Sequence, residues 1–160
     1  MLQIIERMNK LPFSELMEIY IEGNEEKAEA YGDGGLLRAE QEFDDYLRND
    51  FFRIPSAIYC LWRESGKAVS ALRLEPYQDG WLLEALETAP AYRKRGYATA
   101  LVKSVREYLG EEILYSHVSK MNEASLRTHF SCGFEVWKDY AVYLDGSVSQ
   151  RAVTLRSARK

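Results

Sequence analysis

The spacing of hydrophobic residues in the first third of the chain is that of helices rather than strands. After a short hydrophobic run, apolar residues recur every three or four positions, which is typical of amphipathic helices. A glycine-rich segment at residues 32–35 divides this region, so we expect two helices. The predicted elements are a strand at 2–7, a helix that begins at Phe13 and ends between Gly23 and Tyr31, and a helix from Leu36 to Phe51 or Phe52.

From residue 57 onward the pattern changes to short β-rich runs, with helical spacing in two segments. Turn residues at 65–67 and 78–80 separate the first three runs, which predicts a meander of three strands. Gly110 and Gly133 are placed to end the two later helices. The predicted elements are strands at 57–62, 68–74 and 81–87, a helix at 98–109, a strand at 113–118, a helix at 122–132, and strands at 136–144 and 152–155.

This order of elements indicates one α/β domain with a mixed sheet, spanning residues 1–160. A chain of 160 residues is long enough to bury a core without disulfides or a metal. Its 46% hydrophobic and 29% charged residues are average for globular proteins, which excludes disordered and fibrous classes.

Charge and cysteine content narrow the function classes further. The net charge of −4 argues against a nucleic-acid partner. Cys60 and Cys132 are interpreted as reduced thiols of an intracellular protein. No apolar run is long enough to cross a bilayer, and residues 1–7 lack the hydrophobic core of a signal peptide. We therefore expect a cytoplasmic protein with no membrane partner.

The most specific chemical signal lies between the third β-rich run and the next helix. Three consecutive cations, Arg93, Lys94 and Arg95, precede Gly96 and the small residue Ala98. Free N–H groups and the positive end of the dipole point out of the start of a helix, which makes an anion site. Small residues let phosphate oxygens approach the main chain, so a pyrophosphate is the natural ligand. The alternative is a solvated charge run followed by an ordinary loop glycine.

Two motifs in this context resemble the signature of the GNAT superfamily of acyl-CoA-dependent N-acetyltransferases. The first is the Arg-x-x-Gly-x-Ala pattern of residues 93–98, and the second is Asn122 followed by a helix that ends in Gly133-Phe134. The predicted order of elements also agrees with this family over essentially the full chain. The resemblance implies the GNAT fold, in which a twisted, mostly antiparallel mixed sheet of about seven strands is flanked by four helices.

The resemblance also implies where acetyl-CoA, the expected co-substrate, would bind, and it implies no metal. Leu86 and Thr88 would bond the pantetheine arm through their backbone, on a strand that splays away from its neighbour. Asn122 would approach the pantetheine, cap the following helix, or do both. The residues implied for the pyrophosphate loop are Arg93, Lys94, Arg95, Gly96, Tyr97, Ala98 and Thr99.

One position departs from the family pattern. Many members carry there a tyrosine that protonates the departing thiolate, whereas this sequence has His129. A coenzyme A thiol should resemble cysteine, with a pKa of ~8.5, so an imidazolium with a pKa of ~6.5 is a competent donor. His129 is therefore a candidate acid. The alternatives are a packed or capping histidine, with a thiolate that leaves unassisted.

The reaction needs a base, because alkyl amines are protonated near neutral pH and only the neutral amine attacks a thioester. Glu84 and Glu87 interrupt an otherwise apolar strand, where an unpaired carboxylate is costly, so both are candidates. Regular alternation would place them on opposite faces, with one of them reaching the cleft. Each could instead form a salt bridge to Arg73 or another cation on a neighbouring strand. His117 is a third candidate, and a water chain would need none of them.

The leading functional hypothesis is direct acetyl transfer from acetyl-CoA to a primary amine of a small molecule, peptide or protein. The competing classes are a non-catalytic acyl-CoA-binding regulatory module and a domain without a ligand. The acidic run between Glu22 and Asp33 would attract a cationic acceptor, or it is a solvated helix surface. The sequence leaves the identity of the acceptor and a homodimer open.

Overall fold

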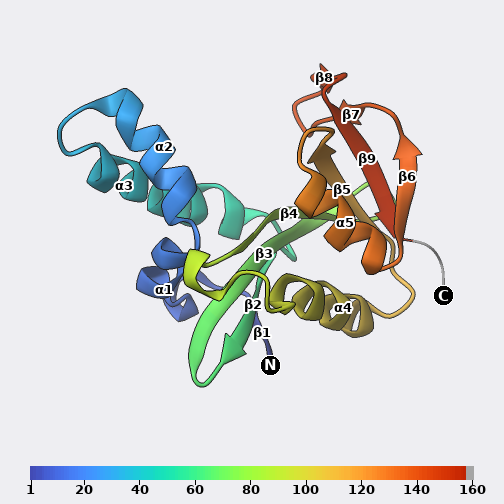
Figure 1. Cartoon of the computed structure of the whole chain (residues 1–160), viewed down its shortest axis with the longest axis horizontal. Helices are drawn as coiled ribbons and strands as arrows, with labels where there is room; N and C mark the ends of the chain where they lie inside the picture. Colours follow the sequence, from blue (N-terminus) through green and yellow to red (C-terminus); the bar gives the residue numbers. More distant parts are fainter. Residues whose placement is uncertain (158–160) are drawn as a thin grey trace.

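The computed structural model describes residues 1–157 and has a seven-stranded mixed sheet at its centre (Figure 1). The strand order is β1-β2-β3-β4-β5-β9-β6, in which β4 and β5 are parallel and the other neighbours are antiparallel. The α/β class and the mixed, mostly antiparallel sheet are therefore confirmed. The strands are β1 (Leu2–Ile5), β2 (Ile58–Glu64), β3 (Lys67–Tyr77), β4 (Gly80–Thr88), β5 (Leu114–Ser119), β6 (Phe134–Lys138) and β9 (Ala152–Ser157).

Five α-helices lie within the described residues, and none of these is long and apolar enough to cross a bilayer. Figure 1 shows α1 to α3 as an arm on one side of the sheet and α4 with α5 on the other. The helices are α1 (Phe13–Ile19), α2 (Ile21–Tyr31), α3 (Gly35–Asn49), α4 (Tyr97–Leu109) and α5 (Glu123–Ser131). The remaining elements are the 3-10 turns η1 (Met8–Lys10), η2 (Phe51–Arg53) and η3 (Pro90–Tyr92), and a hairpin of β7 (Ala141–Val142) and β8 (Val148–Ser149).

The two faces of the sheet pack against different helices because side chains alternate along each strand. On β3, Leu72 and Leu74 point to the face covered by α4 and join a cluster with Leu101. Ala71, which directly precedes Leu72, points to the opposite face and joins a cluster with Leu16 of α1. All five side chains are fully buried, so the sheet supports a core on each face.

The helix predicted from Phe13 is two helices in the structure. The chain leaves helical geometry at Tyr20 (φ −96°, ψ 16°), between α1 and α2. The Tyr20 hydroxyl donates a hydrogen bond to the carbonyl oxygen of Ala85 at 2.6 Å and accepts one from the Tyr59 hydroxyl at 2.8 Å. A contact with the sheet thus accompanies the break, and the expectation of four helices is wrong by one.

The strand predicted over residues 136–144 is also interrupted. It forms β6, which ends at Lys138, and the short β7, which pairs with β8 in a separate hairpin. Between them, the carbonyl oxygen of Tyr140 accepts a hydrogen bond from the Thr154 hydroxyl at 2.8 Å. A side-chain donor on β9 therefore replaces a ladder bond where the strand breaks.

The parallel pair β4–β5 is short. Trp81–Leu83 pairs with Leu114–Ser116, and no further pairs join these two strands in the described part of the chain. Beyond Leu83, β4 keeps its pairing with β3 while its other edge is open. The sheet is therefore split between the carboxyl-terminal ends of β4 and β5, as the family resemblance implies.

A bulge in β4 places Glu84 and Glu87 on the same face of the sheet, so the expectation of opposite faces is wrong. Ala85 has a positive φ of 52°. The register shifts around it, because Arg73 pairs with Glu84 whereas Ala71 pairs with Glu87. Ala71 and Arg73 are positions i and i+2 of β3, so their side chains share a face of the sheet. Their directly opposite partners, Glu87 and Glu84, share that face as well. Both carboxylates therefore point toward the face that carries the helical arm.

Candidate active site

A groove of about 470 Å³ lies where the end of β4, the segment 92–99 and the start of α5 meet. Of the residues predicted to hold the cofactor, those in its lining are Leu86, Thr88, Arg93, Lys94, Gly96, Tyr97, Ala98, Thr99 and Asn122. Arg95 is the exception. Its guanidinium lies 5.5 Å from the centre of the Tyr92 ring. The structure thus brings together nearly all of the predicted cofactor residues.

Residues of α5 that the sequence analysis missed complete this groove. Ala124, Ser125, Arg127 and Thr128 line it beside Asn122. The Asn122 side chain accepts a hydrogen bond from the Ser125 backbone N–H at 3.1 Å, which confirms its capping role. The signal was available, because a helix that starts at a lining residue presents its first turn to the same space.

The start of α4 has a backbone geometry that favours anions. Gly96 is its N-cap with a φ of 82°, and Lys94 has a φ of 61°. Left-handed residues at alternate positions turn successive N–H groups toward one concave surface, which favours anions. The backbone N–H of Ala100 bonds to the Gly96 carbonyl oxygen, so the N–H groups of Tyr97 to Thr99 have no acceptor within the helix.

Three contacts fix the position of the Arg93 side chain. Its Nε donates to the Thr88 carbonyl oxygen at 3.2 Å. Its two terminal nitrogens pair with Glu22 of α2 at 2.9 Å and with Glu87 at 3.2 Å. Arg93 therefore joins the arm to the groove. Glu87 has a salt bridge, but its partner is Arg93 in the segment after β4 rather than a cation on a neighbouring strand. Burial raises the pKa of Glu87, while Arg93 opposes that rise.

A smaller cavity of about 180 Å³ fills the split between β4 and β5. Glu84, His117 and His129 line this split cavity, whereas Glu87 lines the groove instead. The split cavity continues into the groove, because Leu86, Asn122 and Ser125 line both. Three of the four candidate catalytic residues therefore meet at one end of the groove.

His129 is almost fully buried at 1% exposure, and its ring packs edge-on against Phe134. Its Nδ1 lies 2.7 Å from the carbonyl oxygen of Ser125, a contact that only an N–H can make as donor. Nε2 has no hydrogen-bond partner among residues 1–157. Burial lowers the pKa of His129, so the ring is neutral at neutral pH with the bare Nε2 as an acceptor.

His117 reaches the split cavity from β5. Its Nε2 lies 3.4 Å from the Tyr77 hydroxyl, which itself donates to the Val142 carbonyl oxygen at 3.1 Å. Rings of Tyr77 and Tyr143 pack edge-on against the imidazole. Burial lowers the pKa of His117, so this histidine is also uncharged at neutral pH.

Glu84 has the surroundings of a general base. Burial, with a smaller contribution from the neighbouring Glu75, raises the pKa of Glu84 to about 7, while Arg73 opposes the rise. The Arg73 Nε lies 4.0 Å from Glu84 Oε2, so the alternative salt bridge exists but is long. A carboxyl with a pKa near neutrality accepts protons at working pH, because it is then partly ionised and still basic.

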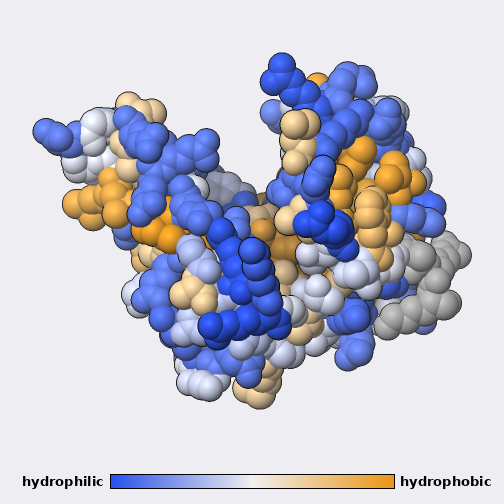
Figure 2. All heavy atoms as spheres, in the orientation of Figure 1, coloured by the Kyte–Doolittle hydropathy of each residue, from blue (hydrophilic) through white to orange (hydrophobic). Residues whose placement is uncertain are grey.

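The surface is hollowed above this cluster. Figure 2 shows a deep notch between the helical arm and the end that carries β7 and β8. In Figure 1, β3 and β4 run across the floor of this notch. A second substrate could therefore approach Glu84 from the face opposite to α4 and α5.

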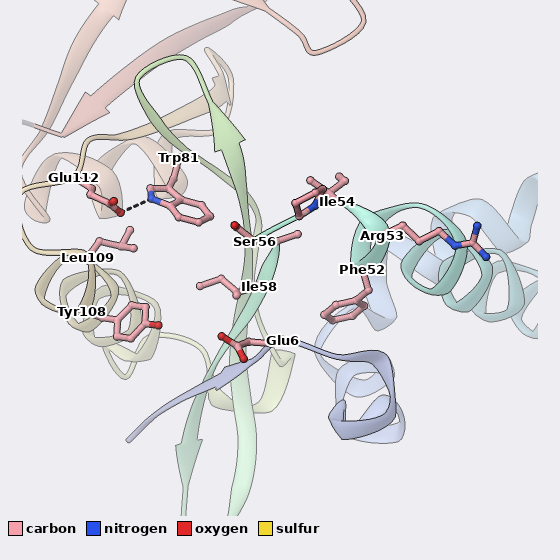
Figure 3. Close-up of a pocket in the computed structure, with 12 residues that line it drawn as sticks. Glu6, Phe52, Arg53, Ile54, Ser56, Ile58, Trp81, Tyr108, Leu109 and Glu112 are labelled. Carbon is pink, nitrogen blue, oxygen red and sulfur yellow. Dashed lines mark hydrogen bonds between the residues drawn. The ribbon is translucent and has the colours of Figure 1, made fainter.

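A larger cavity, of about 740 Å³, lies elsewhere, and none of the predicted site residues line it. Figure 3 shows it between the carboxyl-terminal end of α4 and the segment 52–58. The Trp81 indole donates there to Glu112 Oε2 at 2.5 Å. Size alone therefore does not select the candidate site; the groove is selected by the backbone geometry at the start of α4 and by its junction with the cavity that Glu84 lines. Within residues 1–157, no cluster of three or more metal-ligating side chains is placed to hold an ion.

Solved structures share this fold at low sequence identity. PaiA N-acetyltransferase from Thermoplasma acidophilum, in complex with coenzyme A, has a TM-score of 0.67 and 13% identity, covering 98% of both chains. Aminoglycoside 6′-acetyltransferase type Ii has a TM-score of 0.65 and 15% identity, covering 99% of this chain and 96% of that one. The ribosomal-protein-S18-alanine N-acetyltransferase of Escherichia coli has a TM-score of 0.59 and 19% identity, covering 98% and 93%.

Family membership follows from the sequence itself. No curated protein sequence matches the chain. A model of the acetyltransferase (GNAT) family, however, matches residues 14–134, which include the start of α4, the split strands and α5. Because that match covers most of the chain, the protein belongs to the acetyltransferase (GNAT) family.

Proposed function

We propose that the protein transfers the acetyl group of acetyl-CoA directly to a primary amine in a ternary complex. The observation that carries this proposal is the continuity between the groove and the split cavity, through Leu86, Asn122 and Ser125. A ligand with phosphates at the start of α4 would extend along the groove and place its other end beside Glu84. Acetyl-CoA has this form, and the Thermoplasma neighbour was crystallised with coenzyme A.

In the proposed reaction, Glu84 takes one proton from the acceptor ammonium. The neutral nitrogen then attacks the thioester carbonyl carbon, so that a C–N bond forms and the C–S bond breaks. As the amide forms, the nitrogen loses a second proton and the departing thiolate takes one up, which leaves one proton to be released through Glu84. N–H groups on the open edge of β4 would stabilise the oxygen that becomes negative during attack.

The surroundings of the notch support a cationic acceptor. Glu84 and Glu87 both face the helical arm, and α2 exposes Glu22, Glu25 and Glu26. Negative charge around a cleft raises the local concentration of cations and speeds their association. We therefore propose an alkylammonium acceptor, carried by a small molecule, a peptide or a protein.

The proposal is tested by a panel of amines with acetyl-CoA, with release of the coenzyme A thiol as the readout. We expect acetyl-CoA alone to raise the melting temperature and at least one alkylammonium compound to start thiol release. Thermal stabilisation without release by any amine would instead support the regulatory acyl-CoA-binding module. If millimolar acetyl-CoA produced neither heat of binding nor stabilisation, both functions would be wrong.

Replacing His129 tests whether the thiolate needs a protein acid. Its neutral ring has no proton on Nε2, so we expect His129→Phe to lower turnover by less than about tenfold, below the ~100-fold usual for a positioned acid. The matched variant is His129→Tyr, which restores the residue that many members of the family carry. A large loss in the Phe variant that the Tyr variant reverses would assign the acid role to this position.

A further inference from the structure

Glu75 is a buried acid that lines neither the groove nor the split cavity. Only 4% of this residue is exposed, and it lies on β3, two positions after Arg73. The register pairs Arg73 with Glu84 and Glu75 with Leu82, so Glu75 and Glu84 are diagonal neighbours on one face of the sheet. Long side chains on such a diagonal reach each other.

This diagonal placement brings the two carboxyl groups near each other, and Glu75 raises the pKa of Glu84. Neighbouring carboxyl groups can be joined by a hydrogen bond. Such a bond requires a proton on one of them, because two ionised carboxylates have no donor. Glu84 Oε2 and Arg73 Nε are both buried without a hydrogen-bond partner within the described chain. Arg73, whose Nε makes no hydrogen bond within residues 1–157, is therefore the cation beside two carboxyl groups. Burying both carboxyl groups in their ionised form is costly.

We propose that Glu75 is a positioning residue that shares one proton with Glu84 and so sets the pH at which Glu84 accepts a proton from the acceptor amine. Glu75 has no access to the split cavity, whereas Glu84 lines it, so Glu84 is the member of the pair that meets the substrate. The base is then the fully ionised pair. It takes one proton from the ammonium and becomes the singly protonated pair with its internal hydrogen bond.

Other titratable and charged groups surround this pair, and they are the same in the wild type and in the Glu75 variants compared below. They are Arg73 on β3, Tyr59 on β2, Tyr20 between α1 and α2, Tyr46 of α3 with Asp50 behind it, and Glu87 on β4. Burial raises the pKa of each of these three tyrosines above its usual value, so all three stay uncharged at neutral pH. Arg73 is therefore the one charge among them that opposes proton uptake by Glu84.

The decisive experiment is a carboxyl NMR titration of 13C-labelled protein, with the Glu84 signal assigned from Glu84→Gln. Glu75→Gln replaces a carboxyl by an amide that donates to Glu84 and carries no charge. We expect its Glu84 midpoint to fall by about one pH unit or more from that of the wild type. Glu75→Asp, which keeps the acid, should leave the midpoint between these two values. An unchanged midpoint in Glu75→Gln would overturn the proposal.

Glu87→Gln is the matched control, because it removes a carboxylate from the same face of β4 but one that pairs with Arg93. We expect it to leave the Glu84 midpoint in place, and a shift as large as that of Glu75→Gln would contradict a specific pair. The inference concerns catalysis only if the proposed function holds, yet the titration needs no turnover. An inactive protein would thus refute the function without deciding the pair. In an active protein, the acidic limb of the kcat/KM profile should move with the NMR midpoint.

Discussion

Replacing Gly96 with glutamate is expected to weaken acetyl-CoA binding by about a hundredfold or more, since like charges in contact cost several kcal/mol. Gly96 is the N-cap of α4, and a Cβ there would meet nothing within 4 Å. The new side chain therefore does not collide with the protein, but it places a negative charge where the phosphates of the ligand would bind. Calorimetry with acetyl-CoA and with coenzyme A measures the loss.

Gly34→Glu is the matched control for this change. Gly34 is the N-cap of α3, with φ 73° and ψ 10° against 82° and 11° for Gly96, and its Cβ also has open space within 4 Å. Both variants therefore carry the same cost of a left-handed side chain and the same added charge, but Gly34 does not line the groove. Equal affinity in the two variants would mean that the phosphates are bound elsewhere.

Glu84→Gln is expected to lower kcat/KM by roughly a hundredfold or more, the usual contribution of a positioned base, with acetyl-CoA affinity unchanged. The pKa of Glu84 is raised to about 7, so its ionised form increases as pH rises through 7. Wild-type kcat/KM should therefore rise across that range, and the variant should lose this acidic limb. Steady-state rates between pH 5.5 and 8.5, a range of about 1.5 units on either side, would show both effects.

Glu87→Gln serves as the comparison on the same strand. Glu87 pairs with Arg93 and lines the groove rather than the split cavity, so we expect a loss of less than about tenfold. Near-wild-type rates in both variants would move the base to His117 or to water. A larger loss for Glu87 than for Glu84 would show that the geometry around Arg93, rather than the split cavity, contains the base.

The order of elements and the cofactor groove could be predicted because their signals are local. Gly96 starts a helix, Asn122 caps the next one, and Gly133 follows that helix with a φ of 87°. Each signal depends on a few neighbouring residues, so a single sequence contains it. The family resemblance, which the motifs around these positions carry, implied most of the groove lining; Arg95 does not line the groove, and the first turns of α5 were missed.

The arrangement of the acids could not be predicted, because it depends on contacts between distant segments. Alternation assigns faces correctly only in a regular strand, and the bulge at Ala85 adds a residue between Glu84 and Glu87. The hydroxyl that bonds Ala85 belongs to Tyr20, which is 65 residues away in sequence. Glu75 escaped notice for a related reason, because its neighbour Glu84 comes from the opposite strand.

The short ladder between β4 and β5 is also a place where the sheet can bend. Three residues on each strand hold the two parts of the sheet together by main-chain bonds, while α4 and α5 join them on one face. Small rotations about such a seam change few hydrogen bonds, and a ligand that fills the split touches both parts. We therefore expect a bound cofactor to slow amide hydrogen exchange on β4 and β5 together, and its departure to restore exchange on both strands.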